Sequence, residues 1–362
     1  MILEVHGDAC RLGYLKLASC ILEDGSPRSP DYLASLMLEA CRSLADDVEE
    51  KQLGLLKSEV NARNYVKLAE NLGFYDRKTG RAGDFGAVYL CLSSSEPLKK
   101  HVAGEEQLPL SKILLLNQAE KLLFIQALLT KDHYMMAPIL KWVFKAREFT
   151  RQQAMQTIME EIYPEALRRY AKKLPEKLSR TVEKELAEAS AFREKRESYV
   201  SKIEWIRSRQ YAKYRHAVPP RLEWLVDVGL LERAQRGRYV LSTHASKHHH
   251  ELEVVLSKPR EKIEQEIFKH LAPAAKHPPQ NVESQTMADV YQSLNRMMGR
   301  VRLDLLCLAS AYTLVEKGFK SSPHDMMRVF SYLSLLYPER VFATYSDDGA
   351  AEVSGLDIQL TE

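Results

Sequence analysis

The sequence contains one pattern twice. The first copy reads Leu68-Ala-Glu-Asn-Leu-Gly73-Phe74 and closes, after a polar loop, with Tyr89-Leu-Cys-Leu-Ser93. The second reads Leu225-Val-Asp-Val-Gly229-Leu230-Leu231, continues through Glu-Arg-Ala-Gln-Arg-Gly237, and closes with Tyr239-Val-Leu-Ser242. In both copies a helical pattern stops at a glycine, the residue that most readily ends a helix, and an apolar pair and a polar loop follow. The repetition indicates a structural unit of helix and β-hairpin that occurs twice.

The segment before the first copy supplies two further helices. Residues 11–23 carry apolar side chains at helical spacing, and Ser29 before Pro30 starts a helix that extends to about residue 44. Ser58 is the expected N-cap of a third helix, which ends at Gly73. Residues 74–75 then begin a strand, and residues 87–92 (AVYLCL) are expected to form the returning strand.

Three helices followed by a two-stranded ribbon resemble the winged-helix superfamily, a variant of helix-turn-helix. The resemblance covers residues 10–95 and the flanks of the second copy. It implies that the third helix enters the major groove of DNA and that the ribbon, or wing, lies against the phosphate backbone.

The second unit is interrupted. Its early helices are expected at residues 119–129, 134–146 and 150–163, and its last helix begins at Pro219. Between them, residues 165–215 form a long, charged helical stretch. We expect an inserted arm there, either an antiparallel pair or a long helix broken near residue 175.

The C-terminal part follows a polar, histidine-rich stretch at residues 243–252, which is expected to be a linker. Helices are predicted at residues 257–271, 287–317 (with Gly299 as a weak point) and 323–337, and a hairpin at residues 340–345 and 351–354. Helices followed by a hairpin also suit a third, degenerate winged helix. The predicted fold class is mainly α with small β-hairpins as wings, in domains at residues 1–98, 112–245 and 257–362.

Composition narrows the function classes. The chain has 362 residues, 28% of them charged, and a formal net charge of only +3, so any basic surface must come from local segregation of charge. Its five cysteines are odd in number and include no Cys-x-x-Cys, which favours reduced core residues over disulfides or a zinc site. No apolar run has transmembrane length and the N-terminus lacks signal-peptide character. A cytoplasmic protein that contacts no membrane is expected.

Catalytic motifs are missing from the sequence. It contains no phosphate-binding GxxxxGK[ST], no GxGxxG after a strand, no HExxH and no GxSxG. Asp347 and Asp348 follow a predicted strand and are the only candidates for a Mg²⁺-dependent nuclease, but the next strand offers no lysine. A plain turn is the favoured interpretation, so the chain is predicted to be no enzyme and to need no cofactor.

A histidine cluster offers a second chemical possibility. His244, His248, His249 and His250 lie close together, and imidazoles four residues apart on a helix can hold Zn²⁺ or Ni²⁺. Apart from Glu251, no carboxylate or cysteine nearby completes a tetrahedral set. A solvated linker that binds no metal is the favoured interpretation.

The first winged-helix unit provides candidate DNA contacts. The outward face of its third helix carries Asn and Arg, which can pair with adenine and guanine, and its wing carries cations that suit phosphates. These residues are Asn61, Arg63, Asn64, Lys67, Arg77, Lys78 and Arg81. The alternative is that they are ordinary solvent-facing residues. The acidic residues between Asp46 and Glu50 count against DNA, because they must point away from phosphates.

The third helix of the second unit is less suited to reading bases. It offers Arg221, but also Glu223 and Asp227, which repel phosphate, and Trp224 is expected in the core. Its wing is basic through Arg233, Arg236 and Arg238. This unit is therefore interpreted as a scaffold whose wing can lie on a nucleic-acid backbone.

The arm is the most polarised region. Residues 165–215 contain fifteen Lys or Arg and eight Asp or Glu, an excess of seven positive charges. Tyr170, Phe192, Tyr199, Trp205, Tyr211 and Tyr214 are interleaved, and Arg207, Arg209, Lys213 and Arg215 cluster at its end. Such a helix can follow phosphates or stack on exposed bases. The alternative is a solvated helix with ion pairs four residues apart, such as Glu176–Arg180.

Two functions follow from these patterns. The first is a non-enzymatic, multi-winged-helix protein that binds DNA in preference to RNA. It would act as the DNA-recognition subunit of a prokaryotic defence or restriction-type complex, with protein partners, or as a transcription regulator. The alternative is a scaffold subunit that contacts proteins and not DNA, since winged helices also dock proteins and fold does not fix function. The methionines Met297, Met298, Met326 and Met327 would suit an adaptable partner surface.

Overall fold

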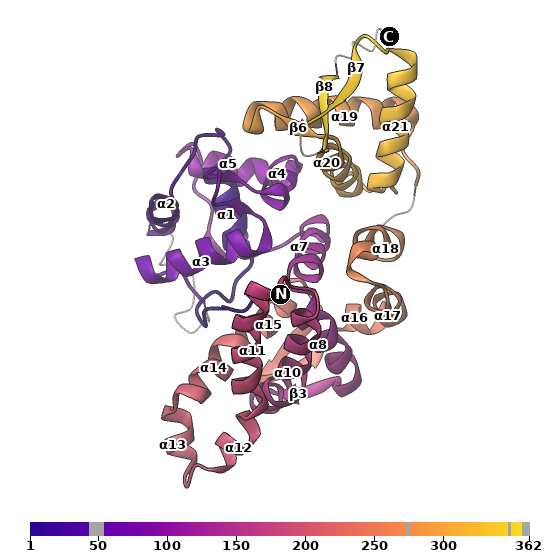
Figure 1. The fold of residues 1–362 in the computed structure, drawn as a ribbon. Helices are drawn as coiled ribbons and strands as arrows, with labels where there is room; N and C mark the ends of the chain where they lie inside the picture. The colour runs from indigo at the N-terminus through magenta and orange to yellow at the C-terminus, as the bar shows by residue number, and fades with distance from the viewer. Residues whose placement is uncertain (43–53, 273–275, 347–348, 357–362) are drawn as a thin grey trace. The chain divides into compact units, whose positions relative to one another are not determined.

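The computed structural model describes residues 1–42, 54–272, 276–346 and 349–356. Helices make up 66% of the chain and the strands form small antiparallel sheets, which confirms a mainly α protein with small hairpins. The chain divides into two compact units (Figure 1), each assembled from separate segments. Unit 1 contains residues 1–12, 54–55 and 128–261, and unit 2 contains residues 13–42, 56–127 and 262–356.

The first part of unit 2 is built around a central helix. Its elements are α1 (Gly13–Ile21), α2 (Pro30–Arg42), α3 (Glu59–Leu72), β1 (Tyr75–Asp76), β2 (Arg81–Ala82), α4 (Asp84–Leu90), the 3₁₀ turn Ser93–Ser95, α5 (Glu96–Val102), α6 (Leu110–Leu114) and α7 (Gln118–Lys131). All nine residues of α1 are buried, because α2 to α6 surround it. Even Lys16 lies inside, where its ammonium group donates to the Leu115 carbonyl at 2.6 Å and pairs with Glu120 at 3.2 Å.

The predicted ends of α3 are confirmed. The Ser58 hydroxyl accepts from the Asn61 amide, so Ser58 is the N-cap, and Gly73 ends the helix with φ of 79°. The side chains that pack inward are Ala62, Tyr65, Val66, Leu68, Ala69 and Leu72.

The strand predicted at residues 87–92 is wrong. This stretch lies in α4, which begins at Asp84, and the ribbon consists only of residues 75–76 paired with 81–82. Residues 85–90 are all buried, and a continuous apolar run does not distinguish a buried strand from a buried helix. Gly86 permits the helix to pack here, because a Cβ at this position would lie 2.3 Å from the Phe74 carbonyl oxygen.

The second part of unit 2 has helices followed by a hairpin. Its elements are α18 (Ile263–His270), α19 (Gln280–Met298), β6 (Val301–Arg302), α20 (Leu303–Glu316), α21 (Pro323–Leu336), β7 (Val341–Tyr345) and β8 (Ala351–Leu356). The long predicted run at 287–317 is divided at Gly299, whose φ is 72°. The three strands form an antiparallel sheet in the order β6-β8-β7, with β7 at its edge.

Unit 1 contains the second sheet. Its elements are α8 (His133–Ala146), β3 (Glu148–Thr150), α9 (Arg151–Thr157), a π-helical turn (Ile158–Ile162), α10 (Tyr163–Ala171), α11 (Glu176–Ser190), α12 (Phe192–Glu197), α13 (Lys202–Arg207), α14 (Arg209–Ala217), α15 (Pro219–Asp227), β4 (Leu231–Gln235), β5 (Arg238–Leu241), α16 (Thr243–Lys247) and α17 (His249–Ser257). The 3₁₀ turn Arg260–Lys262 follows. The sheet order is β3-β5-β4.

The two three-stranded sheets arise from the same succession of elements. In unit 2 the order is α19, β6, α20, α21, β7, β8, and in unit 1 it is α8, β3, α9–α10, α15, β4, β5. In both, the first strand pairs with the third and not with the second. Unit 1 differs because helices α11 to α14 are inserted before α15.

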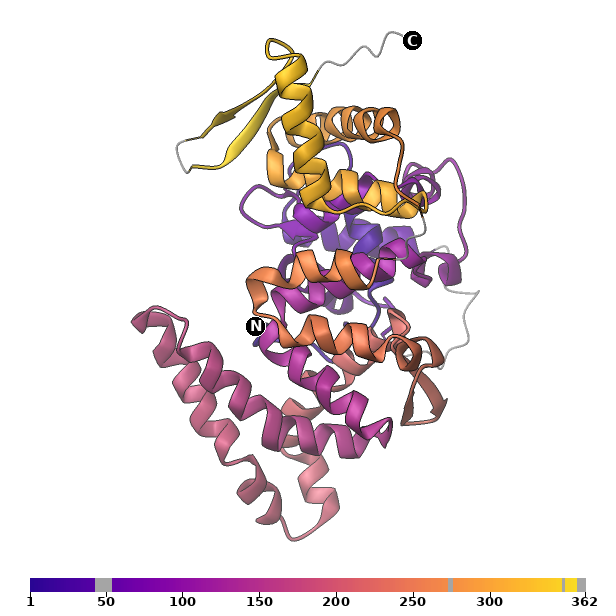
Figure 2. The same cartoon turned by 90° about the vertical axis from the view of Figure 1, so that its right-hand side faces the viewer.

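The inserted helices form the predicted arm. Thr150 caps α9 in a capping box with Gln153, as its position indicates, and the helical path breaks at Pro175 between α10 and α11. Figures 1 and 2 show α11–α12 leading outward and α13–α14 returning beside them. The Lys213 ammonium on α14 pairs with the Glu185 carboxylate on α11 at 2.6 Å, which joins the two runs.

The aromatic residues of the arm pack on one another. Phe192 and Tyr214 are buried with ring centroids 5.1 Å apart, and Trp205 contacts the rings of Tyr199, Tyr211 and Tyr214. These rings are the small core that holds the returning helices to the outgoing ones. Phe192 and Tyr214 are therefore not accessible to nucleic-acid bases, whereas Tyr170, Tyr199, Trp205 and Tyr211 are half-buried and stacking by them stays a prediction.

The linker predicted at residues 243–252 is also wrong, because this stretch forms α16 and the start of α17. The Ser242 hydroxyl caps α16 by accepting from the Ala245 amide. Leu252, Val255 and Leu256 are buried, so α17 packs as part of unit 1.

Gly86→Ala tests how α4 is packed in unit 2. Alanine favours helix by about 1 kcal/mol over glycine, but its Cβ meets backbone at Phe74 and cannot be accommodated by a side-chain rotation. We expect a net loss of roughly 1–3 kcal/mol in the free energy of unfolding, measured by urea denaturation. An unchanged or increased stability would contradict this close packing.

Candidate nucleic-acid interface

The predicted base-reading residues of α3 are partly engaged with the protein itself. The Asn61 side-chain oxygen accepts from the Ser58 hydroxyl at 2.9 Å, so this side chain takes part in the helix cap. The Arg63 guanidinium pairs with Asp31 on α2 at 2.9 Å and lies 3.8 Å from Glu59. Asn64 and Lys67 are half-buried. Two carboxylates beside Arg63 weaken the attraction of this face for phosphate.

The ribbon that follows α3 is similar. Arg77 lies 4.0 Å from Glu70, and Arg81 donates to the Met298 carbonyl at 3.3 Å. Lys78 is exposed, and its backbone amide donates to the Asp76 carboxylate within the turn. The acidic residues Asp46 to Glu50 lie outside the described residues, as do Asp347 and Asp348.

Helix α15, the counterpart of α3 in the second copy of the repeat, is closed to solvent. Its residues from Pro219 to Leu225 are buried, including Trp224, as expected. Residues 1–12 cover it. The Trp224 indole donates to the Ala9 carbonyl at 2.8 Å, and Asp227 accepts from the Leu12 amide at 2.7 Å and pairs with Arg11 at 3.0 Å.

The Arg221 guanidinium anchors the same segment. It pairs with Asp132 at 2.8 Å, with both side chains almost completely buried, and donates to the Ile2 carbonyl at 2.8 Å. The other oxygen of Asp132 accepts from the Ile2 amide at 2.8 Å. No atom of Arg221 is therefore available to a nucleic acid.

Glu223 forms a second buried network on α15. It pairs with Arg233 on β4 and accepts from the Tyr239 hydroxyl at 2.6 Å on β5, with Arg151 3.6 Å away. Burial, followed by the negative charge of Glu223, raises the pKa of Tyr239. This network fixes α15 to the sheet and uses Arg233, one of the cations of the predicted wing.

The remaining wing cations of unit 1 differ in availability. Arg238 pairs with Glu148 on the adjacent strand β3 at 2.6 Å, with both side chains half exposed. Arg236 lies in the β4–β5 turn and is exposed, and the described residues place no carboxylate within ion-pair distance of it. Of the two predicted phosphate contacts on this wing, Arg236 is the better placed.

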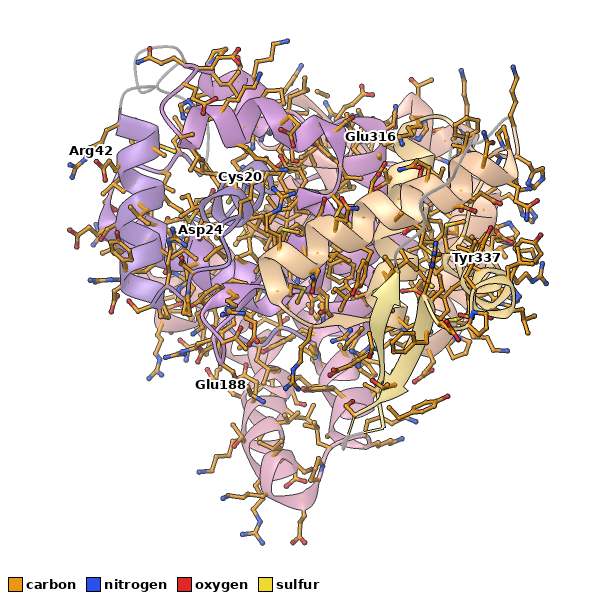
Figure 3. The ribbon with its side chains drawn as sticks, turned by 90° about the horizontal axis from the view of Figure 1, so that it is seen from above. Cys20, Asp24, Arg42, Glu188, Glu316 and Tyr337 are labelled. Carbon is orange, nitrogen blue, oxygen red and sulfur yellow. The ribbon has the colours of Figure 1, made fainter. Side chains whose placement is uncertain are left out.

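On the arm, six of the fifteen cations are held by carboxylates. Arg168 and Arg169 pair with Glu165, Arg180 pairs with Glu176, and Arg193 and Arg196 pair with Glu160. Lys213 lies between Glu185 and Glu188, at 2.6 and 3.1 Å; Figure 3 shows Glu188 on the arm. Lys213 is therefore a structural residue of the arm.

The other nine cations of the arm have no acidic partner within 4 Å in the part of the chain that the structure describes. They are Lys172, Lys173, Lys177, Lys184, Lys195, Lys202, Arg207, Arg209 and Arg215. Arg207, Arg209 and Arg215, which the sequence had singled out, are exposed. Lys202 was not predicted, although it lies in the same basic segment and has no acid four residues away on either side.

Exposed apolar residues lie beside these cations at the outer end of the arm. Val200 is almost fully exposed, Ile203 on α13 is largely exposed and Ile206 is a little less than half exposed. Their exposure was not predicted, because three apolar residues at this spacing are typical of a buried helix face.

The four histidines of the predicted cluster have different surroundings. The His244 and His248 ring centroids are 4.7 Å apart, whereas His249 packs edge-on against Phe144 and lies 3.5 Å from Glu253. No group of three or more His, Cys, Asp or Glu able to hold a metal ion occurs within the described residues.

Burial raises the pKa of all five cysteine thiols. Burial raises the pKa of the thiols of Cys10, Cys41, Cys91 and Cys307 to about 12, so these thiols are protonated at neutral pH. Cys20 is buried as well, and its pKa is also raised.

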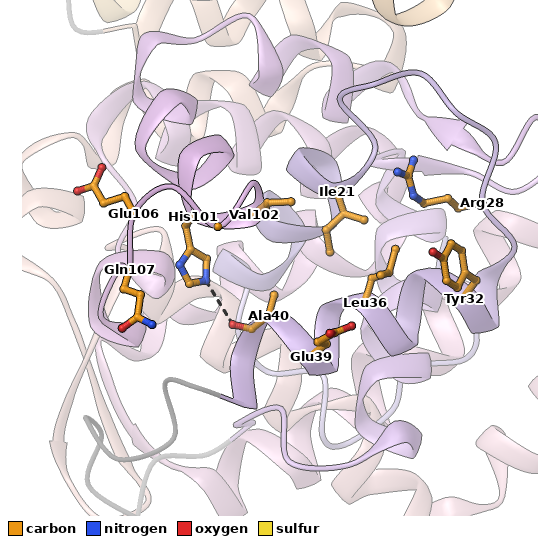
Figure 4. A pocket seen from close by; sticks show the side chains of 11 residues that line it. Ile21, Arg28, Tyr32, Leu36, Glu39, Ala40, His101, Val102, Glu106 and Gln107 are labelled. Carbon is orange, nitrogen blue, oxygen red and sulfur yellow. Dashed lines mark hydrogen bonds between the residues drawn. The ribbon is translucent and has the colours of Figure 1, made fainter.

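Unit 2 contains an open hollow of about 470 Å³ beside α2. Arg28 and Tyr32 lie at one end of it and Glu106 and Gln107 at the other (Figure 4). Its one imidazole, His101, is used by the fold, since Nδ1 accepts from the Leu108 amide at 3.2 Å and Nε2 hydrogen-bonds to the Ala40 carbonyl at 3.2 Å. The lining offers no pair of groups arranged for acid–base or nucleophilic chemistry.

No protein-family model matches the chain, and neither a curated protein nor a solved structure shows significant similarity to it. None of the helices in the described part of the chain combines the length and the apolar character that crossing a membrane requires.

Asp227 gives the segment that covers α15 a measurable pH dependence. Burial raises the pKa of this carboxyl to about 6, more than nearby Arg11 lowers it. Between about pH 4 and 6 the folded protein keeps a proton that the unfolded chain has released, so this group's contribution to stability is lost as pH rises through about 6. We expect wild type to lose roughly 2–3 kcal/mol more than Asp227→Asn between pH 4 and 7, measured by urea denaturation.

Asp24→Asn is the matched control, because the Arg28 guanidinium lowers the pKa of Asp24 to about 2, below this pH window. Equal pH dependence in wild type and Asp227→Asn would show that Asp227 does not titrate as described.

Proposed function

We propose that this chain is a non-enzymatic DNA-binding protein made of several winged-helix units, and that its inserted arm makes the principal contact with DNA. The observation that carries the proposal is the set of nine arm cations to which the described residues offer no acidic partner. A basic helical surface of this kind binds the phosphate backbone and releases counterions.

The winged-helix assignment is supported by the repeated topology. The order helix, strand, helices, two strands, with the first strand paired to the third, occurs in unit 2 from α19 to β8 and in unit 1 from α8 to β5, where α11 to α14 are inserted. The segment α1 to α4 supports it less, because its ribbon is only two residues long on each side and a helix follows.

The usual base-reading helices are poorly placed for DNA in this chain. The counterpart in unit 1, α15, is buried under residues 1–12, and Arg63 on α3 is paired with Asp31. A protein that contacts DNA through an arm of unpaired cations gains affinity without reading base edges. We therefore expect binding of duplex DNA with modest sequence preference, with Arg236 of the β4–β5 turn as an additional contact.

In the cell we propose a cytoplasmic DNA-recognition subunit of a prokaryotic defence or restriction-type complex, with a transcription regulator as the other version of the same function. The size of the chain and its arm exceed what a minimal repressor needs, which favours the subunit. Catalysis would then belong to a partner.

The triple variant Arg207→Ala/Arg209→Ala/Arg215→Ala tests the arm. Fluorescence anisotropy with a labelled duplex, repeated across salt concentrations, gives the slope of log K against log salt. Removing three phosphate contacts should lower that slope by about 2–3 and weaken binding at least tenfold at about 0.1 M salt.

The matched control is Arg168→Ala/Arg169→Ala/Arg180→Ala, which removes the same charge from cations that already have carboxylate partners. We expect a much smaller change in slope. Equal effects of the two triple variants would argue against a localised contact, and failure of wild type to bind at low salt would overturn the proposed function.

A scaffold subunit that binds proteins and not DNA is the second candidate function. It is favoured by α21. This helix directly precedes the hairpin of unit 2, as α3 and α15 precede their own hairpins, but it exposes apolar side chains. Absence of DNA binding at low salt, together with co-purification of a protein partner that survives nuclease treatment and high salt, would select this function.

A further inference from the structure

Exposed apolar side chains, here called the apolar patch, lie on the last part of α21 and on both faces of the strand β7 in unit 2. Leu335 and Tyr345 are each 82% exposed. Tyr332, Leu336, Tyr337 and Phe342 are between 40% and 50% exposed. Figure 3 shows Tyr337 at the end of α21. Residues 332, 335 and 336 share one face of the helix because they are three and four positions apart. A surface of this composition is not suited to phosphate.

Within the described residues, the strand β7 has a free edge that can pair with another strand. In the sheet order β6-β8-β7, one edge of β7 has no partner strand among the described residues. Its sequence, VFATY, contains no charge, proline or glycine. Proteins normally protect an exposed edge with such residues, because unpaired backbone N–H and C=O groups recruit another strand.

We propose that this patch is the interface with a second copy of the chain, formed by antiparallel pairing of β7 with β7 about a two-fold axis near Ala343. In that register Phe342 faces Thr344 of the partner subunit, and Val341 faces Tyr345 of the partner subunit. Arg340 faces Ser346 of the partner subunit. Like charges never oppose each other along the paired strands, so the edge is complementary to itself.

The patch also has the area that a stable dimer needs. At about 200 Å² for a large side chain, the exposed parts of these six residues amount to roughly 700 Å², close to the ~800 Å² that each partner contributes to an interface of standard size. The inference rests on unit 2 alone and does not depend on the arm or on DNA.

Analytical ultracentrifugation across a concentration series tests the proposal on the full chain. Wild type should change from monomer to dimer in the micromolar range, and both Leu335→Glu and Tyr345→Lys should raise the dimer Kd about 100-fold or more. Since both side chains are largely exposed, the variants should keep the wild-type circular dichroism spectrum. Val200→Glu and Leu178→Glu, at exposed apolar positions on the arm of unit 1, are the controls and should leave the Kd unchanged.

A second measurement tests the pairing itself. Ala343→Cys should give an intermolecular disulfide under mild oxidation, because residues opposite each other across a two-fold axis come within disulfide distance. Ser331→Cys, exposed on α21, should not. Wild type that stays monomeric up to about 0.1 mM, or a dimer that persists in both Leu335→Glu and Tyr345→Lys, would overturn the proposal. So would capture of a different protein by the patch without self-association.

Discussion

The ion pair between Arg221 and Asp132 is excluded from water, and the organisation of unit 1 depends on it. Two opposite charges in such a place stabilise the fold only together, since removal of one leaves the other buried and unpaired at a cost of about 3–5 kcal/mol. Both groups also bind the N-terminal segment, and Arg221 donates in addition to the Ala217 carbonyl at 2.7 Å. The Ile2 amide binds Asp132 and the Ile2 carbonyl accepts from Arg221. The pair therefore joins α8, α15 and the N-terminal segment.

This constraint decides where nucleic acid could be contacted. Helix α15 is buried beneath the N-terminal segment and held by ion pairs, so it cannot present side chains to a groove of DNA. The inserted helices of the arm directly precede α15, so this buried helix serves as the base of the arm. The proposed winged-helix unit then supports the arm structurally. The positive charges that a recognition helix would ordinarily carry lie on α11 to α14, which are inserted before α15.

Local signals in the sequence predicted local structure well. Ser58, Gly73, Thr150 and Gly299 act on the backbone within four residues of themselves, so the helix ends they mark could be read directly. The strand expected at residues 87–92 failed because its apolar run is buried on all sides, and nothing in its periodicity separates helix from strand.

The candidate site could be predicted only in part, because its charges are decided by long-range pairing. Arg207, Arg209 and Arg215 remain without acidic partners, but Lys213 in the same cluster is bound by Glu185 on another helix. Asp31 neutralises Arg63 from a different helix, and Asp132 reaches Arg221 across 89 positions of sequence. Counting charges in a stretch of sequence gives its excess of positive charge. It does not say which cations are paired with carboxylates in the folded protein.

The packing of residues 1–12 over α15 also affects how quickly unit 1 can fold. Residues 1–12 are synthesised before the groups that bind them, which lie between residues 132 and 227. Closing so long a loop is slow compared with forming local helices, so the nascent N-terminal segment must wait while the arm is synthesised. Unit 2 is also divided along the chain, because its core joins α1 to helices α19 to α21, which are synthesised much later. All segments of unit 1 have been synthesised by residue 261, whereas unit 2 still needs α19 to α21 at that point.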